Sequence, residues 1–113
     1  MSQVKLYKGD CIKIMTDLVR GGGSRYDFGF TSPPYNRVRN DKYSDYNDTL
    51  DNYYSFLCNV IDLNLKLCDY FFLNIQKNYY NKQDVWKVIG NYSNKIIDIV
   101  CWMWDLELQN CCT

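Results

Sequence analysis

Residues 26–35 of the 113-residue chain read YDFGFTSPPY, an apolar run that ends in the chain's two prolines. The length and aromatic content of the run predict a buried strand over residues 26–32. The prolines must end this strand, because a proline has no N–H to donate to a strand ladder. The sequence therefore predicts a stiff loop at Pro33 and Pro34, directly after a strand.

The segment before this strand predicts a helix preceded by another strand. VKLY at residues 4–7 has the pattern of a short strand, and GDCIKIMTDLVRGGG at residues 9–23 is typical of a turn, a helix and a glycine stop. Asp10 is the natural N-cap of that helix. Strand, helix and strand in about 30 residues form a βαβ unit, and we expect its two strands to be parallel.

The rest of the chain alternates between helical and strand patterns after a polar loop. In order, we expect a loop over residues 36–48, a helix over 49–67, a strand over 69–75, a helix over 81–92, a strand over 95–104 and an irregular tail over 105–113. This order predicts an α/β fold with a partial doubly wound, mostly parallel sheet, in one incomplete domain over residues 1–113.

Composition limits the class of protein. The 13 Lys and Arg residues balance the 13 Asp and Glu residues, so affinity for a polyanion must come from a local basic patch. The chain has six cysteines without metal-like spacing and no histidine, from which we expect reduced, mostly buried thiols and no metal site. No stretch resembles a signal peptide or a membrane span, so we expect a soluble, cytoplasmic protein. Abundant Lys, Asn, Ile and Tyr without Ala favour AT-rich coding DNA, as in some bacteria, phages and large DNA viruses.

The proline pair restricts the backbone of the loop that follows residues 26–32. Each proline fixes its own φ and pushes the preceding residue away from helical angles. The Ser32 hydroxyl and the Pro33 carbonyl can then be held at a fixed separation. Two fixed acceptors suit an amine with two N–H donors, and Tyr35 beside them suits a flat ring. An exocyclic amine on a nucleobase has both properties, and the loop would position it rather than act as a base.

TSPPY at residues 31–35, with KGDC upstream at residues 8–11, resembles the motif (D/N/S)-P-P-(Y/F/W) of the amino-group DNA methyltransferases. The serine is more similar to the N4-cytosine branch than to the N6-adenine branch. The resemblance implies a fold like that of S-adenosylmethionine-dependent methyltransferases and a flipped base whose amine attacks the methyl group of S-adenosylmethionine. It implies catalytic roles for Ser32, Pro33, Pro34 and Tyr35, and cofactor contacts for Asp10, Cys11 and Ser32.

DNA is the partner that the resemblance implies, and the polar loop supplies candidate contacts: Asn36, Arg37, Arg39 and Lys42. Basic side chains here would bind phosphates, which position a protein on DNA without reading its sequence. A solvated loop without a ligand is the alternative.

Structural alternatives also exist for the other candidates. Asp10 can be a helix cap only, and Cys11 can be a small buried residue. Tyr79 and Tyr80 are expected in the core or at an interface rather than as platforms for bases.

The resemblance has a limit at the glycine-rich F-x-G-x-G loop, which this sequence lacks, since its last glycine is Gly90. We expect a truncated enzyme, or one part of a split enzyme whose sheet is completed by a second chain or by another copy. The alternative is a non-catalytic, methyltransferase-like protein with a structural, nucleic-acid-binding or interaction role. A third hypothesis is a proline-motif ligand with exposed residues 32–35.

Overall fold

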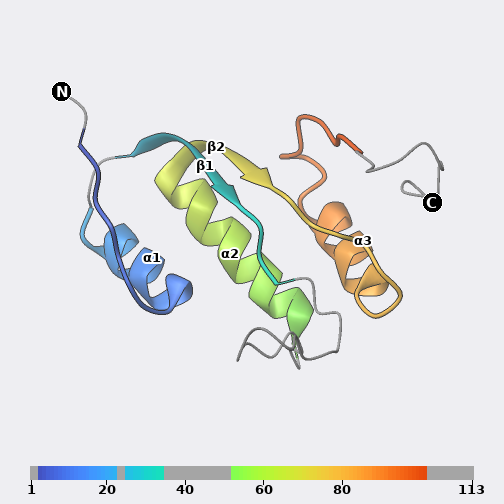
Figure 1. Cartoon of the computed structure of the whole chain (residues 1–113). Coiled ribbons are helices and arrows are strands. Elements are labelled where there is room, and N and C mark those ends of the chain that lie inside the picture. The colour runs from blue at the N-terminus through green and yellow to red at the C-terminus, as the bar shows by residue number, and fades with distance from the viewer. Residues whose placement is uncertain (1–2, 23–24, 35–51, 102–113) are drawn as a thin grey trace. The chain divides into compact units, whose positions relative to one another are not determined.

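The computed structural model describes residues 3–22, 25–34 and 52–101, which form α/β structure (Figure 1). The element order is α1 (Cys11–Arg20), β1 (Tyr26–Thr31), α2 (Tyr53–Leu67), β2 (Cys68–Leu73) and α3 (Lys82–Asn91). Contacts divide the chain into two compact units, the first with α1, β1, β2 and nearly all of α2, and the second with α3. The single domain predicted over residues 1–113 stays a prediction, and the tail predicted over residues 105–113 lies outside the described residues.

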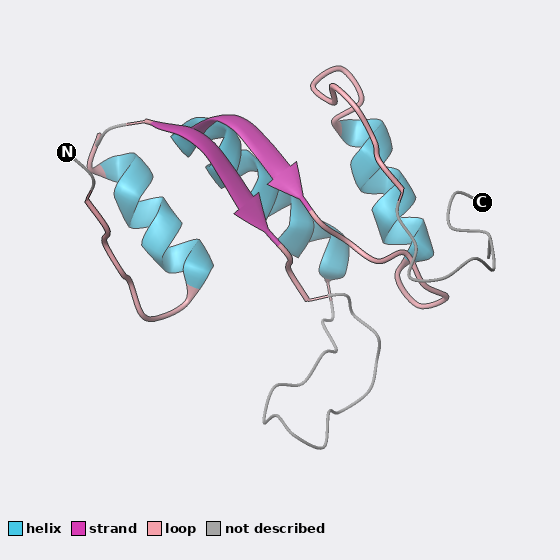
Figure 2. Cartoon of the chain, turned by 45° about the horizontal axis from the view of Figure 1, so that its top comes forward, coloured by secondary structure: helices cyan, strands magenta, loops and turns pink. Residues whose placement is uncertain are grey.

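The sheet of the first unit consists of β1 and β2, which pair in parallel with Tyr26 opposite Cys68 and Thr31 opposite Leu73. The Asn74 N–H donates to the Thr31 carbonyl at 2.9 Å and continues this pairing by one residue. Figure 2 shows both strands side by side along α2, which connects them. The βαβ unit predicted over residues 4–32 is therefore wrong, because residues 4–7 form no strand, and the βαβ unit of the structure consists of β1, α2 and β2.

Two predicted strands are wrong within the described residues. Residues 4–7 form no strand, and the side chains of Val4 and Leu6 are 84% and 93% exposed. Residues 95–101, the described part of the strand predicted over 95–104, form a turn and irregular chain. The apolar pattern is present in both segments, but neither pairs with β1 or β2, and in the second segment the Lys95 and Ile96 N–H groups donate to the Tyr92 carbonyl within a turn.

Helix α1 confirms its predicted start and end. The Asp10 side chain accepts a hydrogen bond from the Ile12 N–H at 3.1 Å, which satisfies one of the unpaired donors of the first turn. At the other end, the Gly21 N–H donates to the Asp17 carbonyl, and Gly22 adopts a left-handed φ of 62°. That angle favours glycine and ends the helix.

Helix α2 passes into β2 without a connecting loop, and Arg25 holds this junction. Its guanidinium donates to the carbonyls of Lys66 at 2.9 Å and Cys68 at 2.8 Å, and to the Asp69 carboxylate at 3.0 Å. The Arg25–Asp69 ion pair is half-exposed and contributes little by itself. The two bonds to carbonyls matter more for position, because they tie the residue before β1 to the start of β2.

The buried core of the first unit is small and comes mainly from α2. Leu57, Val60 and Ile61 are buried on that helix, and Cys68 is buried at the start of β2. Gly29 of β1 also faces α2, since a Cβ atom there would lie 3.2 Å from the Asn64 amide oxygen. One face of the sheet therefore packs on α2, whose buried side chains recur at helical spacing and form one side of the helix.

The second unit is built around α3 and a turn before it. Val85 and Val88 of α3 are buried, with Tyr92 after its last turn. Asn81, the residue before the helix, is fully buried although it is polar. Its amide oxygen accepts from the Asn78 N–H at 2.7 Å and its amide nitrogen donates to the Gln76 carbonyl at 2.7 Å. Asn81 therefore fixes the turn that precedes the helix.

Candidate functional site

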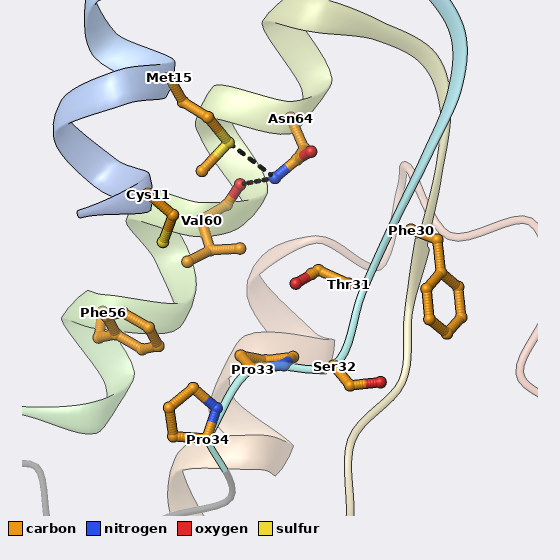
Figure 3. A pocket seen from close by; sticks show the side chains of 10 residues that line it. All are labelled: Cys11, Met15, Phe30, Thr31, Ser32, Pro33, Pro34, Phe56, Val60 and Asn64. Atoms are coloured by element: carbon orange, nitrogen blue, oxygen red, sulfur yellow. Dashed lines mark hydrogen bonds between the residues drawn. The ribbon is translucent and has the colours of Figure 1, made fainter. Parts of the chain in front are cut away.

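A pocket of about 360 Å³ lies in the first unit, at the carboxyl end of β1 and beside the start of α1 (Figure 3). Its lining residues are Cys11, Met15, Phe30, Thr31, Ser32, Pro33, Pro34, Phe56, Val60 and Asn64. The carboxyl ends of parallel strands are where open α/β sheets bind ligands. The pocket therefore occupies the place in this fold where a functional site is expected.

The residues after β1 form one wall of the pocket. Pro33 is buried and Pro34 is half-buried, and neither has a backbone N–H to extend the strand. Successive side chains along an extended chain point to opposite sides. Figure 3 shows this alternation: the Thr31 hydroxyl points into the pocket, whereas the Ser32 hydroxyl points to the other side of the chain.

Ser32 has a partner on that other side. The Asn74 side-chain amide donates to the Ser32 hydroxyl oxygen at 3.0 Å, and the Asn74 backbone N–H donates to the Thr31 carbonyl. Asn74 directly follows β2, so the end of the second strand fixes the loop after the first. Sequence reasoning assigned no role to Asn74, although polar residues after neighbouring parallel strands meet at the same edge of a sheet.

Helices α1 and α2 supply the apolar walls of the pocket. Met15 comes from α1, and Phe56 and Val60 come from α2. Asn64 adds a polar group to this wall, and its amide nitrogen is held by the Val60 carbonyl at 2.8 Å and the Met15 sulfur at 3.5 Å. The pocket is thus largely apolar, with hydroxyl and amide groups concentrated near β1.

Cys11, the first residue of α1, directs its thiol toward Val60 in this pocket (Figure 3). Cys11 is exposed, so the alternative of a small buried residue is wrong, but partial burial of the thiol raises its pKa above the ordinary value of 9.0, and the negative charge of Asp10 raises the pKa further. The thiol is therefore protonated at neutral pH and is a poor nucleophile. Its position suits contact with a ligand rather than covalent chemistry.

The predicted site residues fall into three groups. Ser32, Pro33, Pro34 and Cys11 line the same pocket. Among the described residues, Asp10 is outside that lining and caps α1 instead. The remaining candidates lie outside the described residues: Tyr35, Asn36, Arg37, Arg39 and Lys42.

Residues 3–22, 25–34 and 52–101 contain no group of three or more His, Cys, Asp or Glu side chains placed to hold a metal ion. Their cysteines are free thiols, of which Cys68 is buried, Cys58 is half-buried, and Cys11 and Cys101 are exposed. The prediction that the thiols are mostly buried is therefore wrong for the described residues. No helix in the same residues has both the length and the apolar character that a membrane span requires.

Comparison of the chain with models of protein families, with curated proteins and with solved structures gives no match. The functional argument therefore depends on the site itself: a proline-stiffened loop, a serine hydroxyl held from a second strand and an apolar pocket.

Proposed function

We propose that this chain carries the amine-binding part of an S-adenosylmethionine-dependent DNA methyltransferase, with the N4 amine of cytosine favoured over the N6 amine of adenine. One observation carries the proposal: the Ser32-Pro33-Pro34 loop ends a parallel strand and borders a pocket that begins at α1. The wording of the TSPPY motif and its position at a ligand-binding edge agree with each other. Neither the tetrapeptide nor the edge would support the proposal alone.

The amine would be held by the Ser32 hydroxyl and the Pro33 carbonyl. A hydroxyl oxygen has two lone pairs, and the Asn74 amide uses one of them. The second lone pair can accept one amine N–H, while the Pro33 carbonyl accepts the other. Holding both hydrogens favours a more tetrahedral nitrogen, whose lone pair is then available for bond formation. Preorganised acceptors of this kind lower a barrier by position rather than by basicity.

The pocket on the other side of the loop fits part of the methyl donor. Its volume of about 360 Å³ is in the range of ligand pockets, which is roughly 300–1,000 Å³. Met15, Phe56 and Val60 would contact an adenine ring, with the Cys11 thiol at the rim. When bound, S-adenosylmethionine supplies an electrophilic methyl group on a sulfonium centre. A protonated Cys11 thiol does not compete with the amine for that group.

Proton release completes the chemistry on the protein side. A methylated amine carries one proton more than the neutral product and must lose it. The chain has no histidine to accept it. Ser32 and Pro33 would therefore hold both amine hydrogens until one of them leaves to solvent. This arrangement predicts a reaction in which positioning contributes most of the rate increase.

Transfer of tritiated methyl groups to unmethylated DNA tests the proposal. The purified chain, alone or with any protein that copurifies, should label DNA. Ser32→Ala should reduce the rate by roughly 100-fold, as loss of one preorganised hydrogen-bonding group does in other enzymes. Ser93→Ala in the turn after α3 is the matched control and should label normally. Absence of label with every preparation contradicts the proposal.

A second candidate function is an interaction component without catalysis. It is favoured by the exposed aromatic residues on the sheet face opposite α2, which include Phe28 and Phe72. Calorimetry with S-adenosylmethionine separates the two functions. Micromolar binding that Met15→Ala weakens supports the methyltransferase, whereas a folded chain that takes up no S-adenosylmethionine supports the interaction component.

A further inference from the structure

Three aromatic side chains are exposed within eight residues of the second unit. Tyr79 is 78% exposed, Tyr80 is 60% exposed and Trp86 is 50% exposed. Of the two positions predicted for these tyrosines, the core is therefore wrong, and an interface stays a prediction. They belong to a tight turn before α3 in which the backbone groups bond to Asn78 and Asn81, so their side chains point outward. Aromatic residues so exposed indicate a contact surface rather than a packing role.

Lysine side chains lie against two of these rings. The Lys77 ammonium is 5.1 Å from the ring centroid of Trp86, and the Lys82 ammonium is 5.0 Å from that of Tyr79. Tyr79 and Tyr80 contact each other edge to face, with centroids 5.4 Å apart. We name these five residues, Lys77, Tyr79, Tyr80, Lys82 and Trp86, the aromatic-lysine platform.

The charge of the surrounding segment is positive. From the turn before α3 to Gly90, residues 76–90 contain three lysines and one aspartate, although the whole chain is neutral. Asp84 is half-buried in the first turn of α3, where a carboxylate interacts favourably with the helix dipole. The platform therefore combines flat apolar surfaces with local positive charge.

The backbone beneath the platform is held firmly. The Asn78 amide oxygen accepts from the N–H groups of Tyr80 at 2.8 Å and Asn81 at 3.0 Å. The fully buried Asn81 side chain bonds in return to the Asn78 N–H and the Gln76 carbonyl. A fixed turn presents Tyr79 and Tyr80 in one arrangement, which reduces the ordering that binding would require.

We propose that the aromatic-lysine platform binds single-stranded nucleic acid. Unpaired bases stack on aromatic rings, and lysines beside the rings contact the phosphates, which is the combination that single-strand-binding surfaces use. Bases can displace the lysines from the rings. An exposed cation–π contact favours the lysine–ring contact by only roughly two- to fivefold in its equilibrium constant. Stacking of a base on an aromatic ring strengthens the binding constant by roughly 5- to 150-fold. Each displaced ammonium is then free to contact a phosphate.

The lysines favour this ligand over a protein partner. The buried core of a protein interface is rich in aromatic residues and poor in lysine. Lysines beside these rings would lose their hydration in such an interface. The inference goes beyond methyl transfer, since a chain without catalysis could carry the same platform. Binding is therefore measured without S-adenosylmethionine, so that failure of methyl transfer does not affect the result.

The test is fluorescence anisotropy of a labelled 12-nucleotide oligo-dT with the full chain. We expect tighter binding of oligo-dT than of a 12-base-pair duplex or of polyphosphate of equal charge. Y79A/Y80A should lose at least fivefold in affinity, and Y79F/Y80F, which keeps both rings, should bind like the wild type. K77Q/K82Q should reduce the slope of log affinity against log salt by about 1.4, at about 0.7 for each lost phosphate contact.

Controls separate a binding defect from unfolding. Lys95→Gln removes a lysine of the same unit that lies outside the platform, and it should leave the affinity for oligo-dT nearly unchanged. Far-ultraviolet circular dichroism of Y79A/Y80A should match the wild type, and a folded variant with wild-type affinity overturns the proposal. Equal affinity for polyphosphate, tighter binding of duplex, or loss of self-association in Y79A/Y80A without loss of oligo-dT binding also overturns it.

Discussion

The two faces of the sheet differ in what covers them. On one face, Gly29 and Phe71 lie toward α2, and Thr31 lies with Val60 in the pocket wall. On the other face, Phe28, Phe30, Tyr70 and Phe72 are exposed, and the rings of Phe28 and Phe72 meet edge to face 6.1 Å apart. Both faces belong to the same two strands. Alternation therefore sets which side chains share a face, but only a packed helix turns a face into a core.

Leu57→Ala gives the largest expected effect, because it removes a fully buried side chain beneath the covered face. We expect a loss of about 2–5 kcal/mol in the free energy of unfolding. Phe72→Ala on the open face is the matched change, and it should cost at most about 1.5 kcal/mol, the upper value for one aromatic pair. Urea denaturation followed by circular dichroism measures both, and equal losses would remove the distinction between the faces.

Gly29→Ala tests how closely the covered face is packed. A Cβ atom at Gly29 would lie 2.8 Å from the Cys68 sulfur and 3.2 Å from the Asn64 amide oxygen. Since Cys68 is buried, we expect a loss of about 1–3 kcal/mol in the free energy of unfolding. Gly90→Ala in α3 is the control, because a Cβ there meets nothing within 4 Å. It should stabilise the chain by about 0.5–1 kcal/mol, so a loss at Gly90 equal to that at Gly29 would contradict close packing.

The thiols on the covered side of the sheet give the smallest expected effect. Burial raises the pKa of both Cys11 and Cys68 above the ordinary value of 9.0. The folded chain then binds more protons than the unfolded chain, so the free energy of unfolding falls as the pH rises above 9.0. Denaturation at about pH 8 and about pH 10 measures this decrease. Cys11→Ser should make it smaller, and an unchanged decrease would show that the Cys11 thiol does not contribute.

Local signals predicted the parts of the fold that local interactions stabilise. Asp10 marks the start of α1, and Leu67 marks the end of α2, because capping and helical spacing depend on neighbouring residues. The strands predicted at residues 4–7 and 95–104 were wrong for the described residues because a strand also needs a partner. An apolar pattern shows which side chains could be buried, and it does not show whether another backbone lies beside them.

In the candidate site, too, the features set by neighbouring residues were predictable, and the contact between distant residues was not. The proline pair located the loop at the end of β1, and the predicted helix cap placed Cys11 nearby. The opposite directions of the Thr31 and Ser32 hydroxyls follow from strand alternation, but the bond from Asn74 depends on the register between β1 and β2. That register joins residues 42 positions apart in the chain, as Ser32 and Asn74 are. No short motif contains information over that separation.

Arg25 has a consequence for how fast the chain can fold. Its partners at the end of α2 and the start of β2 lie 41 to 44 residues further along the chain. Bringing the ends of so long a segment together costs chain entropy before any parallel pairing repays it. Helices α1 and α2 can form early from local contacts, whereas the Arg25 bonds report the arrival of β2 beside β1. Replacing Arg25 would then slow refolding if those bonds are present in the transition state, and otherwise would mainly speed unfolding.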